Sequence, residues 1–298
     1  MSGQATDAAT EAFFAHRDLL FTIAYEMLGS AADAEDVLQE TWLRWVEVEP
    51  GRVDEPRAYL VRIVTRQSLN RLRAVKRRRE AYVGQWLPEP LLTSPDVAED
   101  VELAESVSMA LLVVLETLAP AERAVFVLRE VFGAPYEEIA AAVGKSTDAV
   151  RQIAHRARRH VDARRPRRAA SPGEVRAASE SLRRAVETRD LQSLFDVLAP
   201  DVVWLSDGGG VRGAARRPIV GAERVVRFIA GLLGKAPGVV TVHPAVLNGA
   251  PALITRVDGE LDGAVALRVE DGRITGLYYV GNPDKLGRVG RRTALTLR

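Results

Sequence analysis

Hydrophobic residues recur at intervals of three and four through the first eighty residues, which is the spacing of amphipathic helices. The pattern predicts three helices, with the sequences FFAHRDLLFTIAYEML, SAADAEDVLQETWLRWVEV and DEPRAYLVRIVTRQSLNRLRAVKRRRE. Gly29 is expected to end the first helix, and Pro56 fits the first turn of the third. The same spacing returns after a proline-rich stretch, YVGQWLPEPLLTSPD. We therefore expect two all-α domains, over residues 10–84 and 108–166, joined by a linker over residues 85–107.

The pattern changes after a second linker, RRPRRAASPG. Helical spacing over residues 174–188 and 221–234 accompanies five apolar runs that are typical of strands: DVVWLSD, VVTVHPAVL, PALITRV, GAVALRV and ITGLYYV. The turn sequences NGAP, DGELDG and EDGR separate the last four runs, as in an antiparallel sheet. Residues 172–298 are therefore predicted to form an α+β domain.

Composition and charge narrow the class of protein. The 298 residues include no cysteine, and the sequence shows neither an export signal nor an apolar run of about 18 residues, so we expect a cytoplasmic protein without disulfides. The four histidines are scattered, which predicts no metal site, and we expect no cofactor. A formal net charge of +1 conceals two basic blocks, residues 62–79 and 145–168, and an acidic block, residues 96–105. Local surfaces, rather than the overall charge, are thus expected to select partners.

The segment APYEEIAAAVGKSTDAVRQIAHRARRHV predicts a helix-turn-helix. Gly144 ends its first helix, and Ser146 can cap a second helix that buries Val150 and Ile153. The second helix of such a motif enters the major groove of DNA, where Arg151 has the reach for a bidentate contact to guanine. Two packed helices with a solvated basic face are the alternative. The candidate DNA-binding residues are Lys145, Ser146, Thr147, Arg151, His155, Arg158 and Arg159.

The third predicted helix carries another basic surface. Its arginines recur at helical spacing with the amides of Gln67 and Asn70 between them, and an amide among arginines can read base edges as well as phosphates. Three aromatic residues nearby could stack on unpaired bases, namely Trp42, Trp45 and Tyr59. The alternative is that at least two of the three are core residues. The candidate residues of this helix are Arg62, Arg66, Asn70, Arg73 and Arg77.

The second predicted helix has an acidic, amphipathic side. Taken alone, this side is typical of a solvated helix surface. It is formed by Asp33, Asp36, Gln39, Glu40 and Leu43.

In this order, the segments DAEDVLQETWLRW, PRAYLVRIVTRQSLNRLRAVKRR and LAPAERAVFVLREVFGAPYEEIAAAVGKSTDAVRQIAHRAR resemble the two domains of extracytoplasmic-function (ECF) sigma factors. The resemblance covers residues 10 to 165. It implies that the acidic side binds the β′ clamp of RNA polymerase. It also implies that the basic helix opens and reads the −10 promoter element, with Asn70 facing that strand, and that the helix-turn-helix reads the −35 element. Such a protein directs promoter-specific transcription initiation and is not an enzyme.

Three short motifs, WLPEP at 86–90, DGGG at 207–210 and NPDKL at 282–286, resemble the SigJ-type subgroup of this family. The resemblance implies a multidomain chain in which two all-α sigma domains precede a SnoaL-like α+β barrel. On this basis we expect the last domain to pack on the first sigma domain and to regulate it in cis, in place of a separate anti-sigma protein. The residues implicated in that control are Trp86, Pro88, Asp207, Gly208, Gly209, Gly210, Asn282, Pro283, Asp284, Lys285 and Leu286.

The glycines of VVWLSDGGGVRGAARRP spell G-x-G-x-x-G after an apolar run. A dinucleotide-binding turn needs a helix that opens on these glycines and an acidic residue about twenty positions later, and the sequence has neither. In a SnoaL-like barrel the stretch is expected to form a tight bend at the end of a long strand. For Asp207 three interpretations stay open: an interdomain regulatory contact, a purely structural turn, and a ligand-binding or catalytic group.

SnoaL-like barrels include cyclases and isomerases, which need a positioned carboxylate or histidine in an apolar pocket. The candidates are Asp207, His243 and Asp258, and they form no convincing acid–base pair. Asp258 precedes Gly259, which predicts a hairpin turn at these two residues. Two alternative functions remain at this point. One is a helix-turn-helix regulator with a ligand-sensing SnoaL-like domain, and the other is a SnoaL-type enzyme fused to a DNA-binding module.

Overall fold

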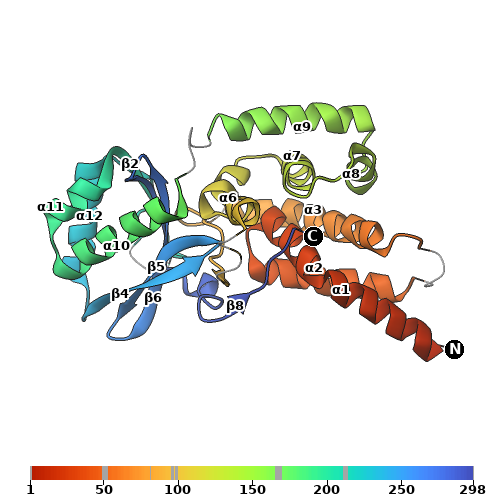
Figure 1. Ribbon diagram of the computed structural model, residues 1–298, viewed down its shortest axis with the longest axis horizontal. Coiled ribbons are helices and arrows are strands. Elements are labelled where there is room, and N and C mark those ends of the chain that lie inside the picture. The colour runs from red at the N-terminus through yellow and green to blue at the C-terminus, as the bar shows by residue number, and fades with distance from the viewer. Residues whose placement is uncertain are drawn as a thin grey trace. The chain divides into compact units, whose positions relative to one another are not determined.

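The computed structural model describes residues 2–48, 53–80, 82–94, 97, 100–164, 170–210 and 214–297, with only the backbone for residues 2–8 and 76–80. The chain forms two compact units, and Figure 1 labels most of their helices and strands. The first unit consists of residues 1–80, 112–165 and 294–298, and the second of residues 81–111 and 166–293.

The first unit begins with three long helices, α1 (Ser2–Leu28), α2 (Ala31–Val46) and α3 (Pro56–Glu80). Gly29 ends α1 with a left-handed φ of 65°, and the side chain of Ser30 caps α2 by accepting a hydrogen bond from the backbone N–H of Asp33 at 3.2 Å. These helices confirm the prediction, except that α1 begins at Ser2 rather than Phe13. The added turns are rich in alanine, which has the highest helix propensity.

The rest of the first unit is helical as well, and it includes the predicted helix-turn-helix. Gly144 ends α8 in the left-handed conformation at a φ of 69°, and the Ser146 hydroxyl caps α9 by accepting from the N–H of Ala149 at 3.3 Å. Helices α7 and α8 pack against α3. The helices are α6 (Met109–Leu115), which spans the boundary between the units, α7 (Pro120–Phe126), the π-helical turn Val127–Val131, α8 (Tyr136–Val143) and α9 (Thr147–Asp162).

The second unit is built on one eight-stranded sheet with the order β3-β2-β7-β6-β5-β4-β1-β8. Strands β4 to β7 are antiparallel neighbours as predicted, whereas β2 runs parallel to β7. The strands are β1 (Leu92–Thr93), β2 (Leu198–Asp207), β3 (Ile219–Val220), β4 (Val240–Leu247), β5 (Ala250–Val257), β6 (Glu260–Glu270), β7 (Arg273–Val280) and β8 (Arg292–Thr293). The helices are α5 (Val101–Ser106), α10 (Pro172–Thr188), α11 (Leu191–Val197), α12 (Ala222–Lys235) and the 3-10 turn Pro283–Lys285.

Helices α10, α11 and α12 contribute to one hydrophobic core with the sheet, in which Leu194, Val225 and Leu277 are fully buried. No helix opens on the described glycines, Gly208 to Gly210, because the next helix begins only at Ala222. This agrees with the exclusion of a dinucleotide-binding turn. The third glycine of that pattern, Gly213, lies outside the described residues.

The proline-rich segment between the two sigma-like blocks does more than connect them. Its Leu92–Thr93 strand, β1, lies between β4 and β8, with Leu92 opposite Leu247 and Arg292. The segment therefore supplies a strand to the sheet of the second unit.

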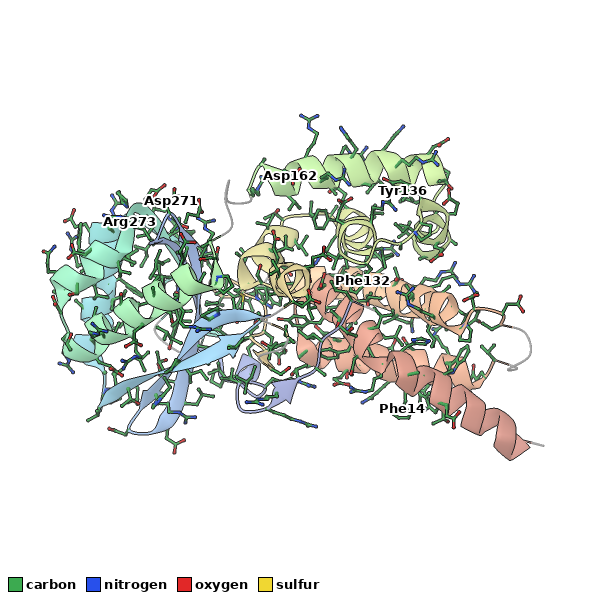
Figure 2. All side chains as sticks on the ribbon, viewed as in Figure 1. Phe14, Phe132, Tyr136, Asp162, Asp271 and Arg273 are labelled. Carbon is green, nitrogen blue, oxygen red and sulfur yellow. The ribbon has the colours of Figure 1, made fainter. Side chains whose placement is uncertain are left out.

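Strand β6 begins earlier than the sequence analysis expected. The predicted hairpin turn at Asp258 (φ 50°) and Gly259 (φ 86°) is confirmed, and these two residues alone form it, so the rest of DGELDG belongs to the strand. The strand consequently starts at Glu260 and places Asp262 within the sheet. The Asp271–Gly272 turn, which lies just before Arg273 in Figure 2, is of the same kind.

None of the described helices is long and apolar enough to cross a membrane. Within the described part of the chain, no group of three or more histidine and acidic side chains is placed to hold a metal ion.

Candidate promoter-binding surfaces and a buried linker junction

The second helix of the helix-turn-helix presents a basic outer face. Of the seven predicted residues, Thr147 is half-buried and the others are exposed: Lys145, Ser146, Arg151, His155, Arg158 and Arg159. The buried stripe beneath them includes Val150, Ile153 and Ala157 as predicted, while Ala149 is only half-buried. The face has the shape and charge that a duplex groove requires.

Two of these arginines are held by carboxylates within the helical unit. Arg158 makes a bidentate pair with Glu130, at 2.9 and 2.7 Å, and this hydrogen bonding raises the pKa of the Arg158 guanidinium. Arg151 lies 3.7 Å from Glu137 and 5.6 Å from the ring centre of Tyr136, which starts α8 and faces α9 in Figure 2. Binding to DNA at this face must exchange these contacts for phosphates or bases.

The predicted residues on the basic face of α3 differ in their exposure to solvent. Arg66, Asn70 and Arg73 are exposed, whereas Arg62 is half-buried with its guanidinium 4.7 Å from the ring centre of Tyr59. The side chain of Arg77 lies outside the described residues.

Gln67 does not belong to this surface. Its side chain is 7% exposed and donates a hydrogen bond to Glu40 at 2.8 Å. The expectation that Gln67 reads bases is therefore wrong, because its position on the helix turns it toward α2.

The aromatic residues near α3 also differ in how deeply they are buried. Trp45 is a core residue, 4% exposed, and its indole N–H donates to the carbonyl of Ala9 at 2.7 Å. Trp42 and Tyr59 are half-buried, so an edge of each remains accessible.

The acidic side of α2 is partly neutralised by α3. Asp33 and Asp36 both pair with Arg71, at 2.7 and 2.6 Å. Burial alone would lower the pKa of the Arg71 guanidinium, but these acids raise it. Of the remaining predicted residues on this side, Gln39, Glu40 and Leu43 are exposed.

An exposed apolar patch accompanies the acidic side, and the sequence analysis missed part of it. Leu43 is 62% exposed and Phe14, labelled on α1 in Figure 2, is 63% exposed. The rings of Phe14 and Trp42 lie 6.4 Å apart. Exposed apolar side chains beside an acidic face are typical of a protein-binding surface.

The basic helix α3 and the helix-turn-helix are in direct contact within the helical unit. Arg66 of α3 donates a hydrogen bond at 2.9 Å to the carbonyl of Ala141 in α8. Arg123 of α7 is 2% exposed, donates from Nε to the carbonyl of Glu26 in α1 at 3.0 Å, and forms an ion pair with Glu116. The sequence gives no sign of this burial, because nothing distinguishes Arg123 from the other arginines of the segment.

A buried carboxylate joins three distant segments of the second unit. The Asp207 side chain is fully buried at the end of β2. Its Oδ1 accepts from the phenol of Tyr82 at 2.5 Å and from the N–H of Gly209 at 3.1 Å. Its Oδ2 accepts from the N–H of Leu87 at 2.9 Å and from Nζ of Lys285 at 2.7 Å. Four donors thus satisfy a carboxylate that burial alone would destabilise. We call this cluster the linker junction.

Lys285 ties the junction to the tryptophan of WLPEP. Its side chain is 11% exposed, donates to the carbonyl of Leu87, and lies with Nζ 3.8 Å from the ring centre of Trp86. A cation so close to an aromatic face, with its charge desolvated, is strongly held. The structure therefore brings WLPEP, DGGG and NPDKL together around one ion pair.

Tyr82 is a functional candidate that the sequence analysis did not name. Besides its bond to Asp207, its phenol accepts a hydrogen bond from the Asn282 side chain at 2.9 Å. Burial, and next the hydrogen bond to Asp207, raise the pKa of the Tyr82 phenol above its ordinary range. Tyr82 follows the basic helix in a segment that reads as linker, so no local pattern marks it.

The glycines of DGGG have distinct positions. Gly209, at a φ of 67°, lies so close to Asn282 that a Cβ there would be 2.6 Å from the amide oxygen. Gly210, at a φ of 74°, would place a Cβ in ordinary contact with Val83, at 3.5 Å. Among the other predicted residues, Pro88, Gly208 and Leu286 are buried, and Pro283 and Asp284 are exposed.

A second anchor holds the linker, at a turn predicted only as a hairpin. The Asn248 side chain accepts from the N–H of Leu91 at 3.1 Å and donates to the carbonyl of Val107 at 3.0 Å. The next residue, Gly249, donates its N–H to the Thr93 hydroxyl at 3.0 Å. The β4–β5 turn thus fixes both ends of the linker's middle section.

The candidates for enzymatic chemistry are dispersed. His243 and Asp258 are exposed, and Asp258 accepts from the N–H of Val239 at 2.8 Å in its turn. Asp207 is fully engaged in the junction. A cavity of about 780 Å³ lies in this unit, and none of the three residues lines it.

The comparisons with known proteins agree with this geometry. The Sigma-70 region 2 family matches residues 13–79 and the Sigma-70, region 4 family matches residues 108–161. The ECF RNA polymerase sigma factor SigJ of Mycobacterium tuberculosis is 37% identical over 286 residues, 92% of this chain and 91% of the relative. The chain belongs to the ECF RNA polymerase sigma factors.

Two further comparisons extend over this sigma factor as a whole. The probable ECF sigma factor SigI of M. tuberculosis is 34% identical over 283 residues, 94% of this chain and 95% of the relative. The crystal structure of M. tuberculosis SigJ matches with a TM-score of 0.76 and 35% identity, over 97% of this chain and all of that one. The predicted class, two all-α sigma domains followed by an α+β domain, is confirmed.

Each of the surfaces described above lies within one of the two matched regions. Region 2 of this sigma factor contains the acidic side of α2 and the basic face of α3, and region 4 contains the helix-turn-helix. Residues 80–107 separate the two matched regions, so the linker begins before the predicted residue 85 and includes Tyr82. The linker junction lies outside both regions. It belongs to the linker and to the C-terminal α+β domain.

Proposed function

We propose that the C-terminal domain of this sigma factor controls promoter-specific initiation in cis, by holding the linker between regions 2 and 4. The observation that carries the proposal is the buried Asp207 carboxylate, which bonds the linker at Tyr82 and Leu87 and is neutralised by Lys285. In this role the domain takes the place of a separate anti-sigma protein.

The distance between promoter elements explains why the linker matters. The −10 and −35 elements are about 25 base pairs apart, roughly 85 Å along the DNA at 3.4 Å per base pair. Regions 2 and 4 cannot reach both elements while Arg66 of α3 is bonded to Ala141 of α8. Residues 81–108, fully extended, span up to roughly 95 Å, which suffices for the separation. Held by the junction and by Asn248, the same segment cannot extend.

The surfaces of the helical unit have separate roles in this proposal. The helix-turn-helix reads the −35 element through Lys145, Ser146, Thr147, Arg151, His155, Arg158 and Arg159. The basic face of α3 opens and reads the −10 element through Arg62, Arg66, Asn70, Arg73 and Arg77. The acidic side of α2, with Asp33, Asp36, Gln39, Glu40 and Leu43, binds the β′ clamp of RNA polymerase, and Phe14 extends that surface.

The C-terminal domain has no enzymatic role in this proposal. Asp207 accepts hydrogen bonds from four donors, so it has no free lone pair directed at a substrate. The other two candidates, His243 and Asp258, lie on exposed positions away from the cavity lining.

The test is run-off transcription with purified core polymerase on genomic fragments. The full chain is compared with a chain that ends before Asn282 and with Asp207→Asn, and Asp201→Asn, an exposed position on the same strand, is the control. We expect specific initiation from the full chain, and a higher level when the junction is broken. Initiation that is equal in all four proteins contradicts control through the junction, and no specific initiation from any of them contradicts the sigma-factor roles assigned above.

A further inference from the structure

A cavity of about 780 Å³ lies in the C-terminal domain, apart from the linker junction. Side chains of α10, α12 and strands β2 and β4 to β7 line it, and most of them are aliphatic or aromatic. Small-molecule sites in proteins have volumes of about 300–1,000 Å³ and mainly apolar walls with a few polar groups. The volume therefore suits one small molecule. The apolar wall includes Leu182, Leu253, Val265 and Leu277.

One wall of the cavity is aromatic. The Trp204 ring is stacked on Tyr279 at 5.8 Å and meets the edge of Phe228 at 5.5 Å. The Trp204 indole N–H is buried and has no hydrogen-bond partner among the residues that the structure describes. This nitrogen is enclosed within the wall, so it is not a contact for an occupant, and the wall offers its aromatic surface alone. Three rings in contact favour a flat, apolar occupant.

A polar pair defines the chemistry of the same wall. The Tyr279 phenol donates to the Asp262 carboxylate at 2.8 Å, and the Thr255 hydroxyl lies 3.4 Å from the same oxygen. Because the phenol's proton is directed at Asp262, the pair offers only acceptors to an occupant. The lining also includes two basic side chains, Arg227 and Lys235, but both are exposed to solvent and Arg227 is paired with Glu223 at 2.6 Å. Because solvated charges are screened, the half-buried Asp262 carboxylate sets the preference, which is for a hydroxyl or N–H donor over a carboxylate.

Two glycines give Tyr279 its position. A Cβ at Gly263 would lie 2.5 Å from the Tyr279 ring, and a Cβ at Gly281 would lie 2.7 Å from it. Any larger residue at either position displaces the ring. The placement of Tyr279 beside Asp262 thus depends on Gly263 in the neighbouring strand β6 and on Gly281, which follows β7 itself.

The cavity and the junction share two paired strands. Strand β2 carries Trp204 in the cavity wall and Asp207 in the junction, three residues later. Strand β7 carries Tyr279 and leads directly into Asn282. Trp204 pairs with Leu277 and Asp207 with Val280 in one parallel ladder. An occupant that contacts Trp204 and Tyr279 acts on the strands that hold the linker.

We propose that this cavity binds an uncharged, largely apolar small molecule with at least one hydroxyl or N–H donor, and that its binding changes the hold of the junction on the linker. The second part rests on the proposed function of the junction.

Binding is tested on the full chain with three fluorescent probes that share one flat ring system: 1-pyrenemethanol, pyrene and 1-pyrenecarboxylate. We expect saturable one-to-one binding of 1-pyrenemethanol, at least tenfold tighter than 1-pyrenecarboxylate. Asp262→Ala removes the carboxylate acceptor and should remove the advantage of 1-pyrenemethanol over pyrene while retaining pyrene binding. Binding that does not saturate, or a carboxylate that binds as tightly as the alcohol, overturns the proposal.

The location of the probe is tested by filling the cavity. Val265→Phe adds volume beside Tyr279, to which Val265 is paired across the strands, and should weaken 1-pyrenemethanol at least tenfold. Val239→Phe, the same substitution at a 69% exposed position outside the lining, is the control and should leave the affinity unchanged. An equal affinity in Val265→Phe, shown to be folded by its circular dichroism, overturns the assignment to this cavity. If Val265→Phe does not fold, Asp262→Ala decides alone.

Coupling is tested separately by run-off transcription with and without saturating 1-pyrenemethanol. We expect at least a twofold change for the parent chain and no change for Asp207→Asn. A bound probe that leaves parent transcription unchanged overturns the coupling. The proposed function is judged from the probe-free comparison of Asp207→Asn with Asp201→Asn, so its failure is distinct from both results.

Discussion

The phenol of Tyr82 donates a 2.5 Å hydrogen bond to the Asp207 carboxylate, across 125 positions of the chain. The contact joins the first described residue of the linker to the last residue of β2. It makes the linker between regions 2 and 4 a structural part of the C-terminal domain.

Tyr82→Phe should destabilise this domain by about 1–3 kcal/mol, because a hydrogen bond to a buried charged group is lost while the ring is kept. Urea denaturation followed by tryptophan fluorescence measures the change. Tyr59→Phe, at a half-buried position in region 2, is the control and should leave the transition of the C-terminal domain in place.

The raised pKa of Tyr82 predicts how that difference depends on pH. The folded state holds the neutral phenol more strongly than the unfolded state, so its contribution is complete below the unfolded pKa of about 10. It is lost only as the pH rises through the higher folded value. The stability difference between the parent and Tyr82→Phe should therefore be constant from about pH 6 to 9 and shrink above about pH 10. A difference that already shrinks near neutral pH contradicts the assignment.

Asp207→Asn should be the most damaging single change in the junction. It preserves the shape of the side chain but leaves Lys285 in a site that is 11% exposed without its countercharge. Removing one partner of a buried pair costs about 3–5 kcal/mol. Thermal unfolding of the domain should shift accordingly, while Asp201→Asn on the exposed side of β2 should have little effect. Equal shifts for the two variants contradict a buried ion pair.

Comparing Gly209→Ala with Gly210→Ala separates two effects on stability: the strain of a left-handed backbone and a steric clash with a neighbouring side chain. Both glycines have a left-handed φ, so alanine costs roughly 1–2 kcal/mol at each. Only at Gly209 does the new Cβ collide with Asn282, which adds an overpacking cost of about 1–3 kcal/mol. Gly209→Ala should therefore destabilise the domain more than Gly210→Ala and should raise initiation in run-off transcription. Equal destabilisation by the two variants would contradict this prediction, because it would mean that the Asn282 side chain can shift away from the new Cβ at no measurable cost.

The sequence predicted the elements whose signals are local. The helix-turn-helix followed from the left-handed Gly144 and the Ser146 cap, and the strands followed from apolar runs divided by Asn-Gly and Asp-Gly turns. The start of β6 was predicted at Gly263, three residues too late, and this error also concerns a local signal. The hairpin turn at Asp258–Gly259 was predicted, but the strand was not started directly after it, which is what places Asp262 in the sheet.

The contacts that unite the molecule could not be predicted in this way. The roles of Tyr82 and Asn248 depend on partners more than a hundred positions away, and nothing in their own neighbourhood distinguishes them from ordinary linker and turn residues. Arg123 illustrates the same limit for a charge, because its partners lie in α1 and in the segment before α7. Recognition of WLPEP, DGGG and NPDKL identified the segments that meet, but not the atoms that join them.

Arg151→Ala tests readout of the −35 element by the helix-turn-helix. If Arg151 contacts a base, the change should cost about 1–3 kcal/mol of binding on the true −35 sequence and relax specificity there. Lys145→Ala is the comparison, and as a phosphate contact it should weaken binding on all sequences alike and reduce the salt dependence. Promoter variants assayed with the polymerase holoenzyme distinguish the two patterns. Uniform weakening by Arg151→Ala would make that residue a phosphate contact as well.

The final prediction concerns the bond between Arg66 and Ala141, which holds α3 against α8 in the helical unit. Because the two promoter elements are roughly 85 Å apart, this contact must open when both are bound. The chain has no cysteine, so dyes can be attached to Ala32→Cys in α2 and Gln152→Cys in α9, both at exposed positions. Energy transfer between them should be high in the free protein and should fall on addition of core polymerase and promoter DNA.

The same labelled pair tests whether the linker junction restrains this opening. In the free protein, Asp207→Asn should lower the energy transfer, because a released linker lets regions 2 and 4 separate, whereas Asp201→Asn should leave it unchanged. Transfer that stays high in Asp207→Asn means that the helical unit is closed by its own contacts, with Arg66 and Arg123 as the residues to change next. Transfer that stays high even in the complex with polymerase and DNA contradicts the separation itself.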